Sequence, residues 1–271
     1  HPPAIGRPPL NDFRVPAVTL AWPFDPSVDL GLVALVAGYV WLGRHSPDLT
    51  GVRAGFFTAG VAILWLALET PLDTLGDRYS QTAHMTQHVC LGVVAPPLLL
   101  LGLSPRMAAA VARPWLRPLL EPVPAQLIAA FVMIAWHVPL AYDLTLGNEA
   151  VHVFEHLTFV AAGAVFWWPL LESTSTTLRW RMSAGAGLVY LLVGTLPQDA
   201  VALVLQFSKT VFYQHYQHAY PFFEGWTPVI DQNVSGVVLM IAGKTSYVIA
   251  GLALFFRWMA ADAREERPAT A

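Results

Sequence analysis

Long apolar blocks constrain this chain more than any other feature of its sequence. A helix needs about 20 apolar residues to cross the hydrocarbon core of a bilayer, and it pairs its own backbone N–H and C=O groups there. Seven segments approach that length, at residues 27–43, 53–70, 84–103, 126–141, 150–171, 183–207 and 234–258. The sequence therefore predicts an all-α fold, a polytopic membrane bundle of about seven transmembrane helices.

The composition agrees with a membrane protein. Only 12% of the residues are charged and 55% are hydrophobic, and the mean hydropathy is +0.51. A soluble domain usually carries about 25% charged residues, so this chain has too little polar surface for a water-soluble globule. The net charge of −3 gives no basis for nucleic-acid binding. The single cysteine, Cys90, excludes an internal disulfide and any CxxC motif.

The distribution of basic residues predicts the orientation of the bundle. Cytoplasmic loops of membrane proteins carry an excess of Lys and Arg. One set of loops, with the C-terminal tail, holds most of them: Arg44, Arg53, Arg106, Arg113, Arg117, Arg179, Arg181, Arg257, Arg264 and Arg267. We therefore expect an extracytoplasmic, proline-rich segment at 1–26, a seven-helix transmembrane domain at 27–260 and a cytoplasmic tail at 261–271. The first residue, His1, fits either a processed N-terminus or a trimmed start.

Two histidine pairs stand at the beginnings of predicted spans. His84 and His88 begin the third span, and His152 and His156 begin the fifth. Four residues advance a helix by about 400°, so the members of each pair share a face one turn apart. This spacing lets two imidazoles reach one metal ion. Because odd-numbered spans start on the same side, we expect both pairs at the outer face.

Further polar residues are expected at the same face. His137 lies near the end of the fourth span, which runs in the opposite direction and therefore also arrives there. Asp231 lies just before the seventh span and is expected to be an outer ligand or an anchor behind the ligands. Gln87 and Glu155 are expected to orient imidazoles, because metal-binding histidines usually have such partners. Cys90 faces away from His84 and His88 and is not expected to bind metal.

Other residues have packing interpretations. His215 and His218 lie beside Tyr213, Tyr216 and Tyr220, a composition typical of an aromatic belt at the membrane interface.

Lys244 lies in the middle of the seventh span and is expected to face Asp199 or another polar group inside the bundle. Buried ionisable groups in membrane spans usually pair with one another.

The histidine pattern leaves several functions open, because imidazole suits copper, zinc and iron. One haem between the third and fifth spans would use only two of the four paired histidines. A membrane zinc hydrolase is a second hypothesis, with Glu155 or Asp231 as base, since residues 152–156 match the HxxEH pattern of inverzincins. A metal-free assembly scaffold is a third hypothesis. Copper handling at the outer face is the fourth, and Met85 would add a soft ligand for it.

Several motifs occur in a fixed order between residues 56 and 258. They are His84-Met-x-Gln-His88 followed by Val94-Ala-Pro-Pro-Leu98, then Trp136-His137-x-Pro139-x-x-Tyr142, His152-x-x-Glu155-His156, Phe166-Trp-Trp-Pro-Leu170, and Asp231-Gln232 followed by Gly236. In these motifs the chain resembles the CtaG-type cytochrome c oxidase assembly factors of bacteria. The resemblance implies a multi-pass protein of the plasma membrane that matures haem–copper oxidase and delivers copper to its copper centre.

The leading interpretation is thus a metallochaperone and not an enzyme, with no catalytic residue. Its expected metal ligands are His84, His88, His137, His152, His156 and Asp231. The expected cargo is copper, as Cu(I) or Cu(II), with zinc as the alternative. The expected partners are oxidase subunits, other copper chaperones and the lipid bilayer, and self-association into a homo-oligomer is left open. A carrier must release its ion, so we expect a site that is open to a partner.

Overall fold

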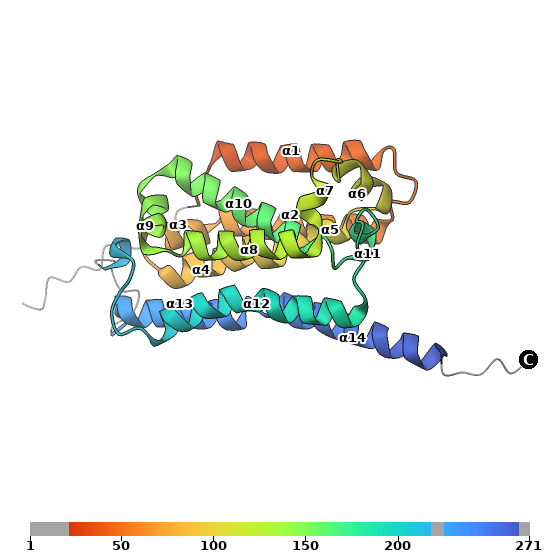
Figure 1. Ribbon diagram of the computed structural model, residues 1–271. Helices are drawn as coiled ribbons and strands as arrows, with labels where there is room; N and C mark the ends of the chain where they lie inside the picture. Colours follow the sequence, from red (N-terminus) through yellow and green to blue (C-terminus); the bar gives the residue numbers. More distant parts are fainter. Residues whose placement is uncertain (1–21, 218–224, 266–271) are drawn as a thin grey trace, which may run out of the picture.

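The computed structural model describes residues 22–217 and 225–265, and helices without any strand make up the regular structure of these residues. Six helices or helix combinations are long and apolar enough to cross a membrane, and one bent helix pair makes a seventh. Figure 1 shows the long helices lying side by side in a bundle. The all-helical prediction of about seven spans is confirmed, and the chain is a multi-pass membrane protein.

The first half of the chain supplies the first three spans and several short connecting helices. They are α1 (Pro26–Gly43), α2 (Gly51–Leu68), α3 (Pro71–Arg78), α4 (Gln81–Val89), the π-helical turn η2 (Cys90–Val94), α5 (Ala95–Leu101), α6 (Pro105–Val111) and α7 (Arg117–Leu120). The short helix α3 connects the second span to the third, and it packs against α4.

The second half supplies the remaining spans. Its elements are α8 (Pro122–Trp136), α9 (Pro139–Gly147), α10 (Glu149–Trp167), α11 (Glu172–Ser175), α12 (Ala184–Phe207), the 3-10 turn η3 (Gln214–Tyr216), α13 (Pro228–Ile241) and α14 (Thr245–Glu265). Two helices, α10 and α13, lie beside the third span. Figure 1 shows α3, α4, α9 and the start of α13 at one end of the bundle, and α6 and α11 at the other.

The third span stays continuous although two prolines interrupt its hydrogen-bond pattern. Pro96 and Pro97 have no backbone N–H and would break an ordinary α-helix. The chain widens into the π-helical turn just before them, and the Ala95 N–H bonds to the Cys90 carbonyl five residues back. One turn of wider helix therefore accommodates the prolines, a common use of π-bulges.

The fourth span is broken, which the predicted segment 126–141 did not anticipate. Its two parts, α8 and α9, meet at 72°. Pro139 is the physical reason, because proline disfavours helical backbone in the residue before it. Val138 accordingly adopts an extended conformation, with φ −65° and ψ 129°. The break leaves His137 at the bend.

The seventh span is also interrupted, between α13 and α14. Lys244 lies at this interruption, and its Nζ is 3.0 Å from Asp199 Oδ2 on α12. The prediction that Lys244 faces Asp199 is confirmed. The neighbouring Gln198 donates its side-chain amide to the Leu239 carbonyl at 2.7 Å. Polar side chains from α12 thus satisfy groups that the interrupted helix would leave unpaired in lipid.

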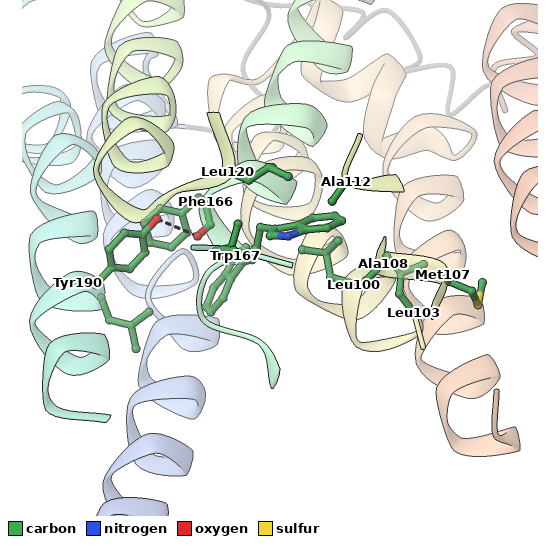
Figure 2. Close-up of a cluster of buried hydrophobic side chains, with 12 residues drawn as sticks. Leu100, Leu103, Met107, Ala108, Ala112, Leu120, Phe166, Trp167 and Tyr190 are labelled. Carbon is green, nitrogen blue, oxygen red and sulfur yellow. Dashed lines mark hydrogen bonds between the residues drawn. The ribbon is translucent and has the colours of Figure 1, made fainter. Parts of the chain in front are cut away.

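An apolar cluster closes the end of the bundle away from α3 and α9. Figure 2 shows Trp167 near aliphatic side chains from the third span and α6, and Phe166 beside Tyr190. Tyr190 donates its hydroxyl to the Phe166 carbonyl at 2.9 Å. This cluster is buried, whereas the opposite end gathers polar side chains in the interior. Polar groups buried together in a membrane span mark a functional site.

Candidate metal centre

Four side chains from two facing helices form the deepest group of possible ligands. His84 and His88 come from α4, and Glu155 and His156 come from α10. Each offers one ligand atom, and these atoms lie within 4.8 Å of one another. That spacing is close to what one ion with bonds of about 2 Å requires. We call these four residues the deep site.

The helix starts explain why the histidines lie where they do. The Ser80 hydroxyl accepts the Ala83 N–H and begins α4, and the Asn148 side chain accepts the Val151 N–H and begins α10. These caps satisfy N–H groups that have no partner inside the helix. Each cap therefore places its histidine pair within the first two turns of a span.

The four paired imidazoles face one another as the HxxxH spacing predicts. The ring centroids of His84 and His88 lie 4.3 Å apart, and those of His152 and His156 lie 4.2 Å apart. Across the helix interface, His84 is 5.4 Å from His152 and His88 is 6.1 Å from His156. The structure brings the rings together, and metal binding by them stays a prediction.

The deep site is buried, which differs from the expected open site. The exposed fractions of His84, His88, Glu155 and His156 are 0%, 2%, 0% and 9%. Helices α4 and α10 place these side chains between spans, where neighbouring helices cover them. Release of an ion therefore needs a route out of the bundle.

Several polar atoms in the deep site lack partners. Among the described residues, the following atoms have no hydrogen-bond partner: His84 Nε2, the two nitrogens of His88, His156 Nε2 and the two carboxylate oxygens of Glu155. His88 Nε2 and Glu155 Oε1 lie 3.6 Å apart. Buried polar atoms are nearly always hydrogen-bonded, and leaving one unpaired costs roughly 1–3 kcal/mol. These donor atoms fit a bound cation.

A second group of possible ligands shares His84 with the deep site. It consists of Asp77, His84 and His152, whose ligand atoms also lie within 4.8 Å of one another. Asp77 Oδ1 is 3.7 Å from His152 Nε2. Burial raises the pKa of Asp77 to about 8, and the negative charges of Asp73 and Glu149 add to the effect. We call Asp77, His84 and His152 the shallow site.

Sequence reasoning missed Asp77. It lies on α3, a separate short helix, so no spacing along the chain connects it to either histidine pair. The packing of α3 against α4 brings it to them.

His137 lies at the edge of the deep site. It is 7% exposed, and its ring centroid is 5.7 Å from that of His88. Its Nδ1 lies 2.7 Å from the Met133 carbonyl, and its Nε2 lies 3.3 Å from Met85 Sδ. The bend at Pro139 thus sets an imidazole beside a thioether next to the buried histidines.

Asp231 does not join either ligand group. Its carboxylate accepts the Ser80 hydroxyl at 2.9 Å and the Gln81 N–H at 2.6 Å. Ser80 is the N-cap of α4 and Gln81 is its first residue, and an acidic side chain is favourable at this end of a helix. Of the two expected roles, the geometry is that of an anchor, which ties α13 to the helix that carries His84 and His88.

Gln87 does not orient an imidazole, so that expectation is wrong. Its amide donates to the Ala67 carbonyl at 3.0 Å and to Asp73 Oδ1 at 2.7 Å, and it ties α4 to α2 and α3. Glu155, also expected behind the ligands, lies among them instead. Cys90 packs in an apolar cluster with Leu64 and Leu91 and lies in neither ligand group of the described residues.

Tyrosines fix the orientation of His84. The hydroxyl of Tyr142 lies 2.7 Å from His84 Nδ1. The hydroxyl of Tyr216 lies 3.3 Å from the same nitrogen and donates to the Gly76 carbonyl at 2.5 Å. Tyr213 stacks on Tyr142 with ring centroids 3.8 Å apart. Partners of this kind hold a metal-binding imidazole in position, and here they leave His84 Nε2 free.

The interpretation of Tyr213 and Tyr216 as an aromatic belt is therefore wrong. Both are 1% exposed and pack in the core around Met85. His215 is exposed, and its Nε2 lies 2.7 Å from the Asp77 carbonyl. His218 and Tyr220 lie outside the described residues. In the loop between α12 and α13, tyrosines alternate with polar residues. This pattern does not reveal which rings point into the bundle.

A family model described as cytochrome c oxidase caa3 assembly factor (Caa3_CtaG) matches residues 33–261. The chain is 24% identical over 299 aligned positions to the uncharacterized proteins Mb0105 of Mycobacterium bovis and MT0111 of Mycobacterium tuberculosis. Each alignment covers 97% of this chain and 42% of the relative, so the chain spans less than half the length of these relatives. No solved structure matches the chain significantly.

Proposed function

The chain belongs to the caa3 cytochrome c oxidase assembly factor family, and from that premise we propose that it binds copper at its buried histidines. The proposed role is to help mature the copper centre of a haem–copper oxidase in the bacterial plasma membrane. Binding and release of the ion are the whole of this activity, and no covalent chemistry is involved.

The observation that carries the proposal is the set of unpaired ligand atoms in the deep site. Three imidazoles and one carboxylate converge there, and each has at least one buried ligand atom without a hydrogen-bond partner among the described residues. A scaffold without metal would carry the cost of these unpaired groups. A bound cation would satisfy them, and histidine with carboxylate is a common ligand set for copper and zinc.

Copper is favoured over zinc by what lies beside the deep site. Met85 is fully buried, and its sulfur lies 3.3 Å from His137 Nε2. Thioether sulfur is a soft ligand that selects Cu(I), while zinc sites in proteins use Cys, His and carboxylate ligands. A Met–His pair next to His88 therefore supports Cu(I) as the cargo.

The proposal places the histidine end of the bundle at the extracytoplasmic face. The basic loops lie toward the other end, and such loops are cytoplasmic in most membrane proteins. An oxidase subunit that receives copper at the outer face would then be the partner, with other copper chaperones as donors of the ion.

Complementation of a deletion strain under copper limitation tests this function. The strain is supplied with the wild-type protein, with His88→Ala or with His45→Ala, and the copper content and activity of the oxidase are measured in its membranes. His45 is exposed on the loop between α1 and α2, so it is a matched control. We expect wild type and His45→Ala to restore copper-loaded oxidase, and His88→Ala to fail. Fully copper-loaded oxidase in the deletion strain would contradict the proposal.

A further inference from the structure

The two ligand groups lie one helical turn apart and overlap at one residue. His88 and His156 belong to the deep site alone, and His152 belongs to the shallow site alone. Four residues along an α-helix correspond to about 6 Å of rise. The shallow site is therefore one turn nearer to the end of the bundle, while His84 serves both groups.

His84 has only one nitrogen to offer. Its Nδ1 lies 2.7 Å from the Tyr142 hydroxyl, whereas its Nε2 has no partner within the described part of the chain. One lone pair binds one ion, so an ion in the shallow site and an ion in the deep site would compete for it. The geometry makes the two sites alternatives and not a pair of simultaneous sites.

The shallow site also leads toward solvent. The side chain of Asp77 is 28% exposed and that of His152 is 6% exposed, while the side chains of His88 and Glu155 are 1% and 0% exposed. The deep site is thus closed off, and Asp77 is the member of the two ligand groups whose side chain is partly exposed, although its Oδ1 is buried.

We propose that Asp77, His84 and His152 form a transfer site through which copper enters and leaves the deep site. This inference rests on the proposed copper binding. His84 keeps the ion throughout, Asp77 and His152 release it, and His88, Glu155 and His156 take it up. Each bond to the ion that breaks is replaced by another, so the transfer needs no oxidant or reductant.

Such a step predicts a kinetic role for Asp77 and an equilibrium role for His156. A group that holds the ion only on the way in and out changes both rates by the same factor and leaves the affinity unchanged. The Asp77 side chain is the most exposed of the shallow site, and its substitution removes the ligand nearest to solvent.

The test measures copper transfer into the full chain in detergent or nanodiscs. Cu(I) is supplied as a coloured complex with a chelator, stopped-flow absorbance gives the loading and release rates, and elemental analysis gives the occupancy at equilibrium. The variants are Asp77→Asn, Asp77→Glu, His156→Ala and the control Asp73→Asn. Asp73 lies on the same helix and bonds to Gln87, so its variant makes the same substitution of a carboxyl by an amide outside the shallow site.

We expect Asp77→Asn to slow loading and release by about tenfold each, a barrier higher by about 1.4 kcal/mol, with one copper still bound at equilibrium. Asp77→Glu should recover part of the rate, and Asp73→Asn should match wild type. His156→Ala should lose tight binding.

Three results would overturn the transfer site while leaving copper binding intact. They are wild-type rates in Asp77→Asn, a loss of affinity in Asp77→Asn equal to that in His156→Ala, and two copper ions bound at once by the wild type. Failure of the wild type to bind any copper would overturn the proposed function together with this inference.

Discussion

At the scale of single residues, a tyrosine hydroxyl sets the orientation of the His84 ring. Tyr142 is fully buried, and its hydroxyl holds the Nδ1 side of the imidazole at 2.7 Å. The contact determines which nitrogen is free for an ion and which way the ring points. His84 belongs to both ligand groups, so this one hydroxyl influences the whole centre.

Tyr142→Phe should weaken copper binding by about 10- to 100-fold, because hydrogen-bond partners of metal-binding histidines contribute that much to metal affinity. Competition against a copper chelator measures it. Tyr190→Phe is the control, because it also removes a tyrosine hydroxyl bond, to the Phe166 carbonyl in the distant apolar cluster. Equal affinities in the two variants would show that the Tyr142 contact does not position His84.

The sequence revealed the paired histidines, because helical spacing alone places His84 with His88 and His152 with His156. It could not reveal Asp77 or the inward turn of Tyr216, since both depend on how α3 and η3 pack on α4 and α9. Contacts between segments far apart in the chain leave no periodic signal in it.

At the scale of helices, the two histidine helices approach closely because glycine lines their contact. A Cβ added at Gly163 on α10 would lie 2.2 Å from the Gly92 carbonyl oxygen and 2.7 Å from Pro96 Cγ. Small residues that let backbones touch are a common basis of helix packing in membranes. Here the contact sets the distance between α10 and the third span, and hence between the ligands that they carry.

Gly163→Ala should destabilise the protein by about 1–3 kcal/mol, the usual cost of overpacking. Thermal unfolding in detergent measures the change. Gly185→Ala on α12 is the matched control, since a Cβ there meets nothing within 4 Å. The account of the helix contact fails if both variants unfold at the same temperature as wild type.

The ion pair between Lys244 and Asp199 should show strong coupling in a double-mutant cycle. Lys244→Met should lower the unfolding temperature, because Asp199, with a side chain 19% exposed, loses its partner. The double variant Lys244→Met/Asp199→Asn should be more stable than Lys244→Met alone, since an unpaired charge in a membrane span is costly. Additive effects of the two substitutions would contradict a direct pair.

The helix pattern was largely predictable and its interruptions were not. Apolar length indicated the spans, because a bilayer imposes it on any helix that crosses. The break at Pro139 depends on local backbone geometry, and so does the π-helical turn before Pro96. A hydropathy profile averages over many residues and does not show such local changes of the backbone.

At the scale of the whole molecule, the orientation of the bundle decides where copper would enter and leave. Figure 1 shows α9 at the histidine end, and α6 and α7 toward the opposite end. Basic loops predict that the histidine end is extracytoplasmic. In a carrier that serves the outer face, the path by which the ion reaches its ligands must open on that side.

Cysteine labelling tests this orientation in a Cys90→Ala background. Gly147 is exposed at the end of α9, and Arg113 is exposed between α6 and α7. Gly147→Cys should react with a membrane-impermeant thiol reagent in intact cells, and Arg113→Cys should react only after permeabilisation. The reverse pattern would place the histidines at the cytoplasmic face.

Metal analysis of the purified protein beside a His84→Ala/His156→Ala double variant tests whether the buried histidines bind copper. We expect close to one copper per wild-type chain after loading with Cu(I), and none in the double variant. Zinc in place of copper would point to the hydrolase. No metal in either protein would contradict the account and make the histidine cluster structural.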